Sequence, residues 1–297
     1  MPSEPQAAQE MHDAESVIKR NPHGDFNTVQ ESRPDWDHER SFHYTKTLKP
    51  DWQYGAGSSK PSTASHVGID PYEEGRPPAH NYKLLISGII PRPVGFLSTV
   101  SADGSSTNLA PFSYTQVVNH DPPIFIVGFS GGLDKAKDTL RNLMDTGECV
   151  INIISEDFIE AANACAIDLP YGKSEWSVSG LTPGETSLVK PKRVKESVFS
   201  IEGKLQSTQE FESRQTPGKK TGVIAIIEGV KFWVREDAIN EEKNLIDPEV
   251  LRPIARLGGI TYARVTDGFE FPRPVLKEEV NQGKLDQDII KTKVEGQ

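Results

Sequence analysis

The segment that most constrains this chain is residues 89–115, IIPRPVGFLSTVSADGSSTNLAPFSYT, because its pattern is typical of one β-hairpin. Residues 94–100 are apolar and β-branched enough to predict a buried strand. Asp103-Gly104 predicts a two-residue type I′ turn, in which both central residues take positive φ. Residues 106–110 form the expected return strand. The segment therefore commits this part of the chain to antiparallel β structure.

Prolines limit how the hairpin continues at both ends. Pro91 and Pro93 fix φ and keep Arg92 out of a helix. Pro111 has no N–H to donate to a ladder, so the return strand is expected to stop at Pro111-Phe112-Ser113. A hairpin that ends in this way leaves backbone N–H groups available to a ligand.

Strand patterns dominate the rest of the chain. Strands are expected at residues 124–129, 148–154, 198–211 and 221–235, and a shift in alternation near Glu228-Gly229 indicates a bulge. A helix is expected at 156–166, a short helix or strand at 81–88, and a loop anchored by Trp176 at 169–184. No βαβ rhythm is present, so the fold class expected is mainly β with short helices, a β-barrel rather than a Rossmann domain.

A second informative cluster follows Gly131-Gly132. Asp134 is the expected N-cap of a helix that Gly147 ends, and this places Lys135 and Lys137 in the first turn, where the helix dipole disfavours cations. A bound phosphate would resolve the conflict, because N–H groups, two ammonium groups and the Thr139 hydroxyl all favour an anion. Two surface lysines without a role are the alternative.

The third cluster is LRPIARLGGITY at residues 251–262. Gly258-Gly259 permits close approach of the backbone to another group. Arg252 and Arg256 are suited to pair with phosphate or with acidic side chains.

Charge and composition exclude several classes of protein. A formal net charge of −10 without a basic stripe argues against nucleic acid as a partner. No apolar run is long enough to span a bilayer, and no signal peptide is apparent at the N-terminus, so a cytoplasmic protein without a membrane partner is expected. Cys149 and Cys165 are expected to be buried thiols, and the histidines show no metal-ligand spacing.

The two ends of the chain differ from its centre. Residues 1–79 are polar and rich in Pro and Ser, and are expected to be an extension or arm. Five aromatic residues between positions 33 and 55 suggest that it docks on the barrel or on a partner subunit, and a solvated tail is the alternative. Residues 80–275 are expected to be the barrel domain, and 276–297 a charged C-terminal tail.

Residues 81–271 resemble the flavin reductase-like family, the FMN-binding split barrels. The similarity rests on PRPVGFLSTVSADGSSTNLAPFSYTQVVNHDPPIFIVGF, KDTLRNLMDTGECVINII, GLTPGETSLVKPKRV and LRPIARLGGITY, which occur in the family's order. The resemblance implies a Greek-key-like split barrel that forms a homodimer, with FMN near the subunit interface. FAD is the less expected flavin. NAD(P)H is implied as the co-substrate that passes a hydride to FMN, and the final electron acceptor is unknown.

The resemblance also implies which residues bind the cofactor. The hairpin residues are expected to face the isoalloxazine and ribityl groups, although ordinary hairpin polarity is the alternative for Thr99 and Asn108. Lys137-Asp138-Thr139 matches the family's phosphate-side motif, and the third cluster is expected near the flavin. The candidate cofactor-binding residues are Arg92, Ser98, Thr99, Asn108, Ala110, Pro111, Phe112, Ser113, Lys135, Lys137, Asp138, Thr139, Arg256, Leu257 and Gly258. No catalytic acid or base is nominated.

Three functions remain open at the level of sequence. The first is an FMN-dependent oxidoreductase that uses NAD(P)H, either as a flavin reductase or on a specific small molecule. The second is a non-catalytic FMN-binding protein whose arm docks partners. The third, a member that has lost flavin, is disfavoured by the retained NLAPFS and KDT segments.

Overall fold

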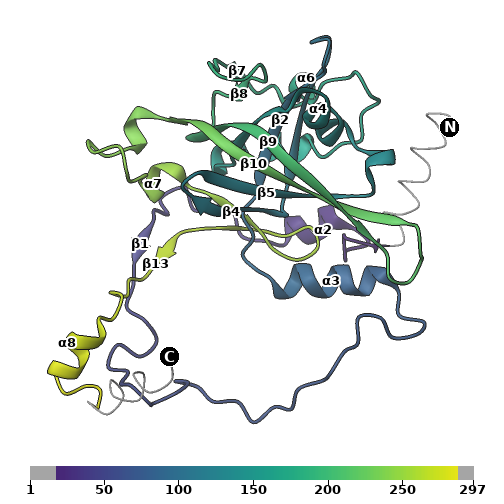
Figure 1. Cartoon of the computed structure of the whole chain (residues 1–297). Helices are drawn as coiled ribbons and strands as arrows, with labels where there is room; N and C mark the ends of the chain where they lie inside the picture. The colour runs from purple at the N-terminus through teal and green to yellow at the C-terminus, as the bar shows by residue number, and fades with distance from the viewer. Residues whose placement is uncertain (1–17, 287–297) are drawn as a thin grey trace, which may run out of the picture. The chain divides into compact units, whose positions relative to one another are not determined.

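The computed structural model describes residues 18–286, and it divides into two compact units (Figure 1). In the described part of the chain, unit 1 comprises residues 18–39 and 70–265, and unit 2 comprises residues 40–69 and 266–286. The division expected from the sequence, with borders after residues 79 and 275, stays a prediction. Residues 1–17 of the expected arm and 287–297 of the expected tail lie outside the described residues.

Unit 1 is built on a seven-stranded antiparallel sheet with the order β3-β2-β6-β9-β10-β5-β4. The mainly β class with short helices is thereby confirmed. The two edge strands, β3 and β4, are consecutive in the sequence and are joined by Ser113-Tyr114, which brings the edges of the sheet together there. The strands are β2 (Gly95–Val100), β3 (Thr107–Phe112), β4 (Thr115–His120), β5 (Pro123–Ser130), β6 (Glu148–Ile153), β9 (Phe199–Glu212) and β10 (Lys220–Val234).

The predicted hairpin is present as β2 and β3, but its turn and its end differ from the prediction. Ser101 pairs with Ser106, and Gly104 takes positive φ (74°) whereas Asp103 does not, so the loop is wider than a type I′ turn. The Asp103 carboxylate accepts hydrogen bonds from Ser101 and Ser105, which stabilise the wider loop and lower the pKa of Asp103 to about 2.

Pro111 does not end the ladder as predicted. Strand β3 continues through Pro111 to Phe112, with Pro111 opposite Phe96. The Leu109 N–H donates to the Glu175 carboxylate at 3.0 Å, away from β2, so the alternate residue Pro111 also directs its backbone away from β2. Proline is tolerated there because an N–H at that position would have no strand partner.

The inner core lies within the curved sheet. It contains Leu97, Val127, Phe129, Ile151 and Ile227, among others, and α4 (Asp138–Thr146) adds Leu140 and Leu143. The long strands β9 and β10 form a hairpin, and the register shift between Gly229 and Lys231 confirms the predicted bulge.

A second core cluster lies on the opposite face of β2, β3 and β6. Alternate residues of β2 point to opposite faces, so Phe96 joins this cluster while Leu97 joins the first. The 3-10 turn η2 (Glu156–Phe158), α5 (Ile159–Ala164) and α6 (Glu175–Ser179) carry several of its members, including Phe158, Ala162 and Trp176. The helix expected at 156–166 is thus confirmed, with a 3-10 first turn. The segment expected as a loop contains α6.

Both cysteines are buried thiols, as predicted. Cys149 lies in β6 within the inner core, and burial raises its pKa to about 12. Cys165 is the C-cap residue of α5, and burial raises its pKa to about 11.

The remaining elements of unit 1 are short. Helix α3 (Pro78–Gly88) precedes the hairpin and settles the helix-or-strand alternative at 81–88 in favour of a helix. Two small antiparallel pairs are β7 (Pro183–Gly184) with β8 (Arg193–Val194) and β11 (Ile254–Arg256) with β12 (Tyr262–Arg264). The others are α2 (Phe26–Glu31), η1 (Leu133–Lys135), η3 (Glu236–Ala238) and α7 (Pro248–Leu251).

Unit 2 joins a segment of the expected arm to the C-terminal region. Strand β1 (His43–Tyr44) pairs in parallel with β13 (Asp267–Gly268), and the Phe42 ring lies against Gly268. Helix α8 (Leu276–Asn281) buries Val280. Trp36, which belongs to unit 1, lies under the Arg264 guanidinium at 3.7 Å from the ring centroid. None of the helices in the described part of the chain has the length and apolar character that a membrane span requires.

Candidate functional site

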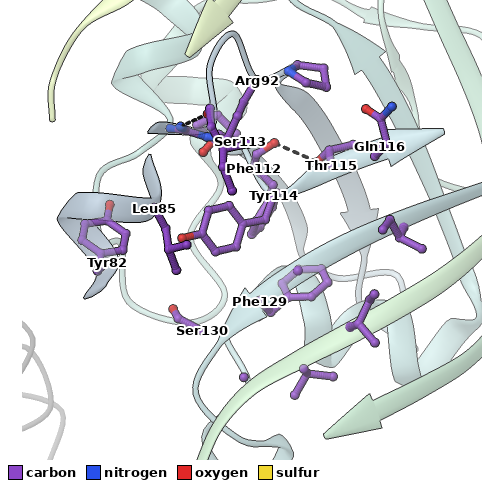
Figure 2. A pocket seen from close by; sticks show the side chains of 18 of the residues that line it. Tyr82, Leu85, Arg92, Phe112, Ser113, Tyr114, Thr115, Gln116, Phe129 and Ser130 are labelled. Atoms are coloured by element: carbon purple, nitrogen blue, oxygen red, sulfur yellow. Dashed lines mark hydrogen bonds between the residues drawn. The ribbon is translucent and has the colours of Figure 1, made fainter. Parts of the chain in front are cut away.

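A cavity of about 1000 Å³ opens in unit 1 beside the bend that joins β3 to β4 (Figure 2). Along β5, Val127 and Phe129 point into the inner core, so Ile126, Gly128 and Ser130 face the other side of the sheet. The cavity is lined by these outward residues, by Phe129, by residues 221–224 of β10, by the bend and by α3. Its size is at the upper end of the range for small-molecule sites, roughly 300–1000 Å³.

The floor of the cavity contains two glycines at its outward positions, Gly128 and Gly222, beside the larger Ile126 and Ile224. Gly222 of β10 lies directly opposite Ser130 of β5, and Gly128 follows two residues away on the same face. A Cβ at Gly128 would lie 3.0 Å from the Tyr114 Cβ, whereas one at Gly222 would meet nothing closer than 3.5 Å. The sheet backbone is therefore exposed to a planar ligand over Gly222.

The bend supplies backbone donors next to this floor. Among the described residues, neither the Ser113 nor the Tyr114 N–H has a hydrogen-bond partner, while the Tyr114 carbonyl accepts from the Gly128 N–H at 2.7 Å. The Thr115 hydroxyl donates to the Phe112 carbonyl at 2.8 Å and fixes the shape of the bend. The sequence-based expectation of available N–H groups after the hairpin therefore applies at Ser113 and Tyr114.

Arg92 forms part of the cavity wall and is itself buried, with 7% of its surface exposed. Its guanidinium donates to the carbonyls of Ile86 (2.5 Å), Ile89 (2.9 Å) and Leu257 (2.9 Å), and its Nε has no hydrogen-bond partner among residues 18–286. Burial lowers the pKa of Arg92, and the nearby Arg256 lowers it further. In the described part of the chain, neither arginine forms an ion pair with a carboxylate.

Four of the predicted polar residues are buried in hydrogen bonds behind the hairpin. The Ser98 hydroxyl donates to the Lys192 carbonyl at 2.5 Å, and Thr99 accepts from Asn142 at 3.2 Å. The Thr139 hydroxyl donates to Asn108 Oδ1 at 2.5 Å, and Asn108 in turn donates to Glu175 at 3.2 Å. The side chains of Thr99, Asn108 and Thr139 link the hairpin to α4 and α6, Ser98 links it to the segment before β8, and none of the four lines the cavity.

The two lysines of the second cluster differ in position from the prediction. Helix α4 begins at Asp138, with Lys137 as its N-cap residue. The non-helical Ala136 separates it from η1. Asp134 is therefore not the N-cap. Lys135 lies outside α4, so the predicted conflict does not involve it, whereas Lys137 stands at the N-terminus of α4, where the helix dipole disfavours a cation. Lys137 lines the cavity and forms an exposed ion pair with Asp168 at 3.5 Å. Burial raises the pKa of Asp138.

The third cluster supports the cavity wall from behind. Arg256 pairs with Arg92 through two backbone hydrogen bonds of 2.9 and 3.1 Å, and its guanidinium lies over the Tyr262 ring. Leu257 provides a carbonyl to Arg92, and Gly258 lies against Ser87 of α3. The other arginine of the cluster, Arg252, pairs with Glu156 at 2.8 Å.

The cavity thus brings together five of the predicted site residues and leaves ten outside its lining. The five are Arg92, Pro111, Phe112, Ser113 and Lys137. The ten are Ser98, Thr99, Asn108, Ala110, Lys135, Asp138, Thr139, Arg256, Leu257 and Gly258. Sequence reasoning did not find the lining residues Tyr82, Leu85, Tyr114, Gly128, Ser130 and Gly222.

The flavin reductase like domain model matches residues 87–251, more than half of the chain. The chain belongs to the flavin reductase-like family. The chain is therefore a flavin-related oxidoreductase with a split-barrel core.

Solved structures agree with this assignment. Nitrilotriacetate monooxygenase component B from Bacillus cereus is 33% identical, with a TM-score of 0.66 over 70% of this chain and 100% of its own. The 2-nitrobenzoate 2-nitroreductase NbaA of Pseudomonas fluorescens is 25% identical, with a TM-score of 0.61 over 71% and 97%. A split-barrel-domain protein from Shewanella frigidimarina NCIMB 400 is 22% identical (TM-score 0.57; 70% and 99%) and shows the fold.

Proposed function

We propose that this member of the flavin reductase-like family binds FMN in the cavity and accepts electrons from NAD(P)H. The observation that carries the proposal is the open sheet backbone at Gly222 beside the two N–H groups of Ser113 and Tyr114. A planar ring with acceptor atoms at its edge fits such a surface, because the sheet backbone provides a flat contact and the bend provides donors.

The charge of the lining also suits a phosphorylated cofactor. Lys137 is half exposed at the cavity, and its exposed pairing with Asp168 contributes little energy, so its ammonium group is available to a phosphate. The hydroxyls of Ser130 and Thr221 add further donors to the lining. FMN, when bound, would supply the hydride chemistry, while these residues would orient it and exclude water from its covered face.

Exposed apolar residues support the proposal of a homodimer with the cavity near the interface. Val117 and Val118 of edge strand β4 and Tyr114 of the bend are each about half exposed. Sedimentation velocity on the purified chain tests this proposal, and a monomer at all concentrations would contradict it.

The spectrum of the purified protein tests the central proposal. A flavin absorption band that bleaches anaerobically after addition of NADH or NADPH is expected. A colourless protein that does not take up added FMN would refute FMN binding. A flavin band indifferent to both nucleotides would refute the nicotinamide part of the proposal alone.

Gly222→Val gives a matched structural test. Valine favours strands, and its Cβ at 222 meets only ordinary contacts, so the fold should keep its thermal stability while the side chain fills the floor. We expect FMN affinity to fall at least about tenfold, which corresponds to the loss of about 1.4 kcal/mol of binding energy. Ser207→Val, at an exposed strand position outside the lining, is the control and should bind FMN normally.

A second candidate is an enzyme in which the bound flavin acts on a specific small molecule. The similarity to a 2-nitrobenzoate 2-nitroreductase favours this candidate, as does a cavity at the upper end of the size range for one ligand. Turnover of nitroaromatic compounds by the NADH-reduced protein tests it, with free FMN at equal concentration as the control.

A further inference from the structure

One wall of the cavity consists of side chains to which the proposal above assigns no contact with the flavin. This α3 wall consists of Tyr82 and Leu85 of α3, Ile89 at its C-terminal end, and Arg92. Figure 2 shows the Tyr114 ring beside Tyr82 and Leu85, with its hydroxyl end directed toward them. Aliphatic and phenolic groups therefore surround one region of the cavity.

The phenol groups are donors without partners in the described part of the chain. Neither the Tyr82 nor the Tyr114 hydroxyl forms a hydrogen bond there. Burial raises the pKa of Tyr114, and the neighbouring Tyr82 raises it further, so the Tyr114 phenol stays protonated at neutral pH. Two O–H groups beside one cavity wall favour an acceptor, and an anionic acceptor most strongly.

The same wall contains an uncompensated positive charge. Only 7% of the Arg92 surface is exposed. Within residues 18–286, Arg92 forms three hydrogen bonds to carbonyls but no ion pair, and its buried Nε has no hydrogen-bond partner. Arg256, which pairs with Arg92 through the backbone, lies outside the lining with its guanidinium over the Tyr262 ring, and it too has no carboxylate partner within residues 18–286. Buried cations are normally paired, so an anion in the cavity would offset this charge.

We propose that the α3 wall is a subsite for a second ligand, a small aromatic acid with one carboxylate, which binds beside the flavin. The phenols of Tyr82 and Tyr114 donate to the carboxylate, Arg92 provides the compensating charge, and Leu85 and Ile89 contact the ring. The inference deepens the proposed function by naming a substrate class, and it rests on that function only in placing the ligand next to FMN.

Benzoate is the probe, and uncharged benzamide of nearly the same shape is the matched ligand. Binding to the full chain is measured by calorimetry, with and without saturating FMN. We expect benzoate to bind at least about tenfold more tightly than benzamide, and with similar affinity in the presence and absence of FMN.

Phenylalanine variants assign the binding to the wall. Tyr82→Phe and Tyr114→Phe remove only a hydroxyl that has no hydrogen-bond partner within residues 18–286, so the fold is retained, and each should weaken benzoate binding about tenfold. Tyr171→Phe is the control, because Tyr171 is exposed under Arg141 and outside the lining, and it should leave benzoate binding unchanged.

Each contrary result overturns a separate statement. Equal binding of benzoate and benzamide, or benzoate binding that is indifferent to both tyrosine variants, would refute the subsite. Displacement of benzoate by FMN would show that the wall holds the FMN phosphate, which refutes the second ligand and leaves the proposed function intact. Tyrosine-dependent benzoate binding by a chain that takes up no FMN would refute the proposed function alone.

Discussion

Replacing Glu202 by glutamine should destabilise the protein at neutral pH, although the two side chains have nearly the same shape. Glu202 is fully buried in β9. One carboxylate oxygen accepts from the Ser187 N–H (2.9 Å) and the Trp233 indole (2.6 Å), and the other from the Leu188 (2.6 Å) and Val189 (3.1 Å) N–H groups. All four donors need an acceptor, and a glutamine offers one oxygen.

The magnitude follows from the two donors that lose their acceptor. Each hydrogen bond to a charged group contributes about 1.5–3 kcal/mol, so the loss of two predicts a fall of about 3–6 kcal/mol in the free energy of unfolding. At about 2–4 °C per kcal/mol for a domain of this size, the melting temperature should fall by at least about 6 °C. Glu196→Gln is the control and should cost less than about 1 kcal/mol, because this partly exposed carboxylate accepts from one donor within residues 18–286, the Thr182 N–H.

The pH dependence gives an independent check. Burial alone would raise the pKa of Glu202, but the hydrogen bonds from Trp233 and from Ser187, Leu188 and Val189 outweigh it and lower the pKa. A lowered pKa means that this stabilisation is present above the unfolded value of about 4.3 and is lost as the pH falls through the folded pKa. Urea unfolding at several pH values should show that the difference between wild type and variant shrinks in acid. A variant as stable as wild type at pH 7 would refute the reasoning.

Three further outcomes are expected. Lys137→Met should weaken FMN binding about tenfold in a fluorescence titration but leave the binding of riboflavin unchanged. The control, Lys173→Met, should change the binding of neither flavin. Equal effects of Lys137→Met on both flavins would contradict a phosphate contact. Glu156→Gln should lower the free energy of unfolding by about 1–3 kcal/mol, because Glu156 pairs with both Arg252 and Arg264. Burial would raise the pKa of Glu156, but the two arginines outweigh it and lower the pKa. Urea unfolding should therefore show that the difference between wild type and variant vanishes in acid, and a difference that persists there would contradict this. Burial raises the pKa of Glu175, so the free energy of unfolding of the wild type should fall as the pH rises from about 4.3 toward neutrality. Glu175→Gln should make this free energy less dependent on pH. An unchanged pH dependence in the variant would contradict this reasoning.

Local sequence patterns predicted the strands well, because alternation and β-branching act within a few residues. The β2–β3 hairpin, the β9–β10 hairpin and the bulge before Lys231 were all visible in this way. Pro111 misled because a proline ends a central strand but is tolerated on an edge, and edge position depends on the whole sheet. The start of α4 was missed because the non-helical Ala136 separates η1 from α4, so that Asp134 lies within η1 and is not the N-cap of α4.

The cavity was harder to predict because its parts are distant in the sequence. Gly128 and Gly222 share a floor only through the register of β5 with β10, and Tyr82 reaches it from a helix before the hairpin. A glycine at an outward strand position is the one local signal that sequence reasoning passed over. Asn108 and Thr139, which were both predicted to bind the cofactor, hydrogen-bond to each other behind the hairpin.

The two buried cysteines allow the opening of the fold to be measured by thiol labelling. The sequence contains only Cys149 and Cys165, and both thiols are buried with pKa values raised to about 12 and about 11. A thiol-reactive dye at neutral pH therefore meets almost no thiolate while the barrel is closed. Labelling of Cys149, at the centre of the inner core, measures how often the whole barrel opens, and labelling of Cys165 measures opening of the helical layer over β2, β3 and β6.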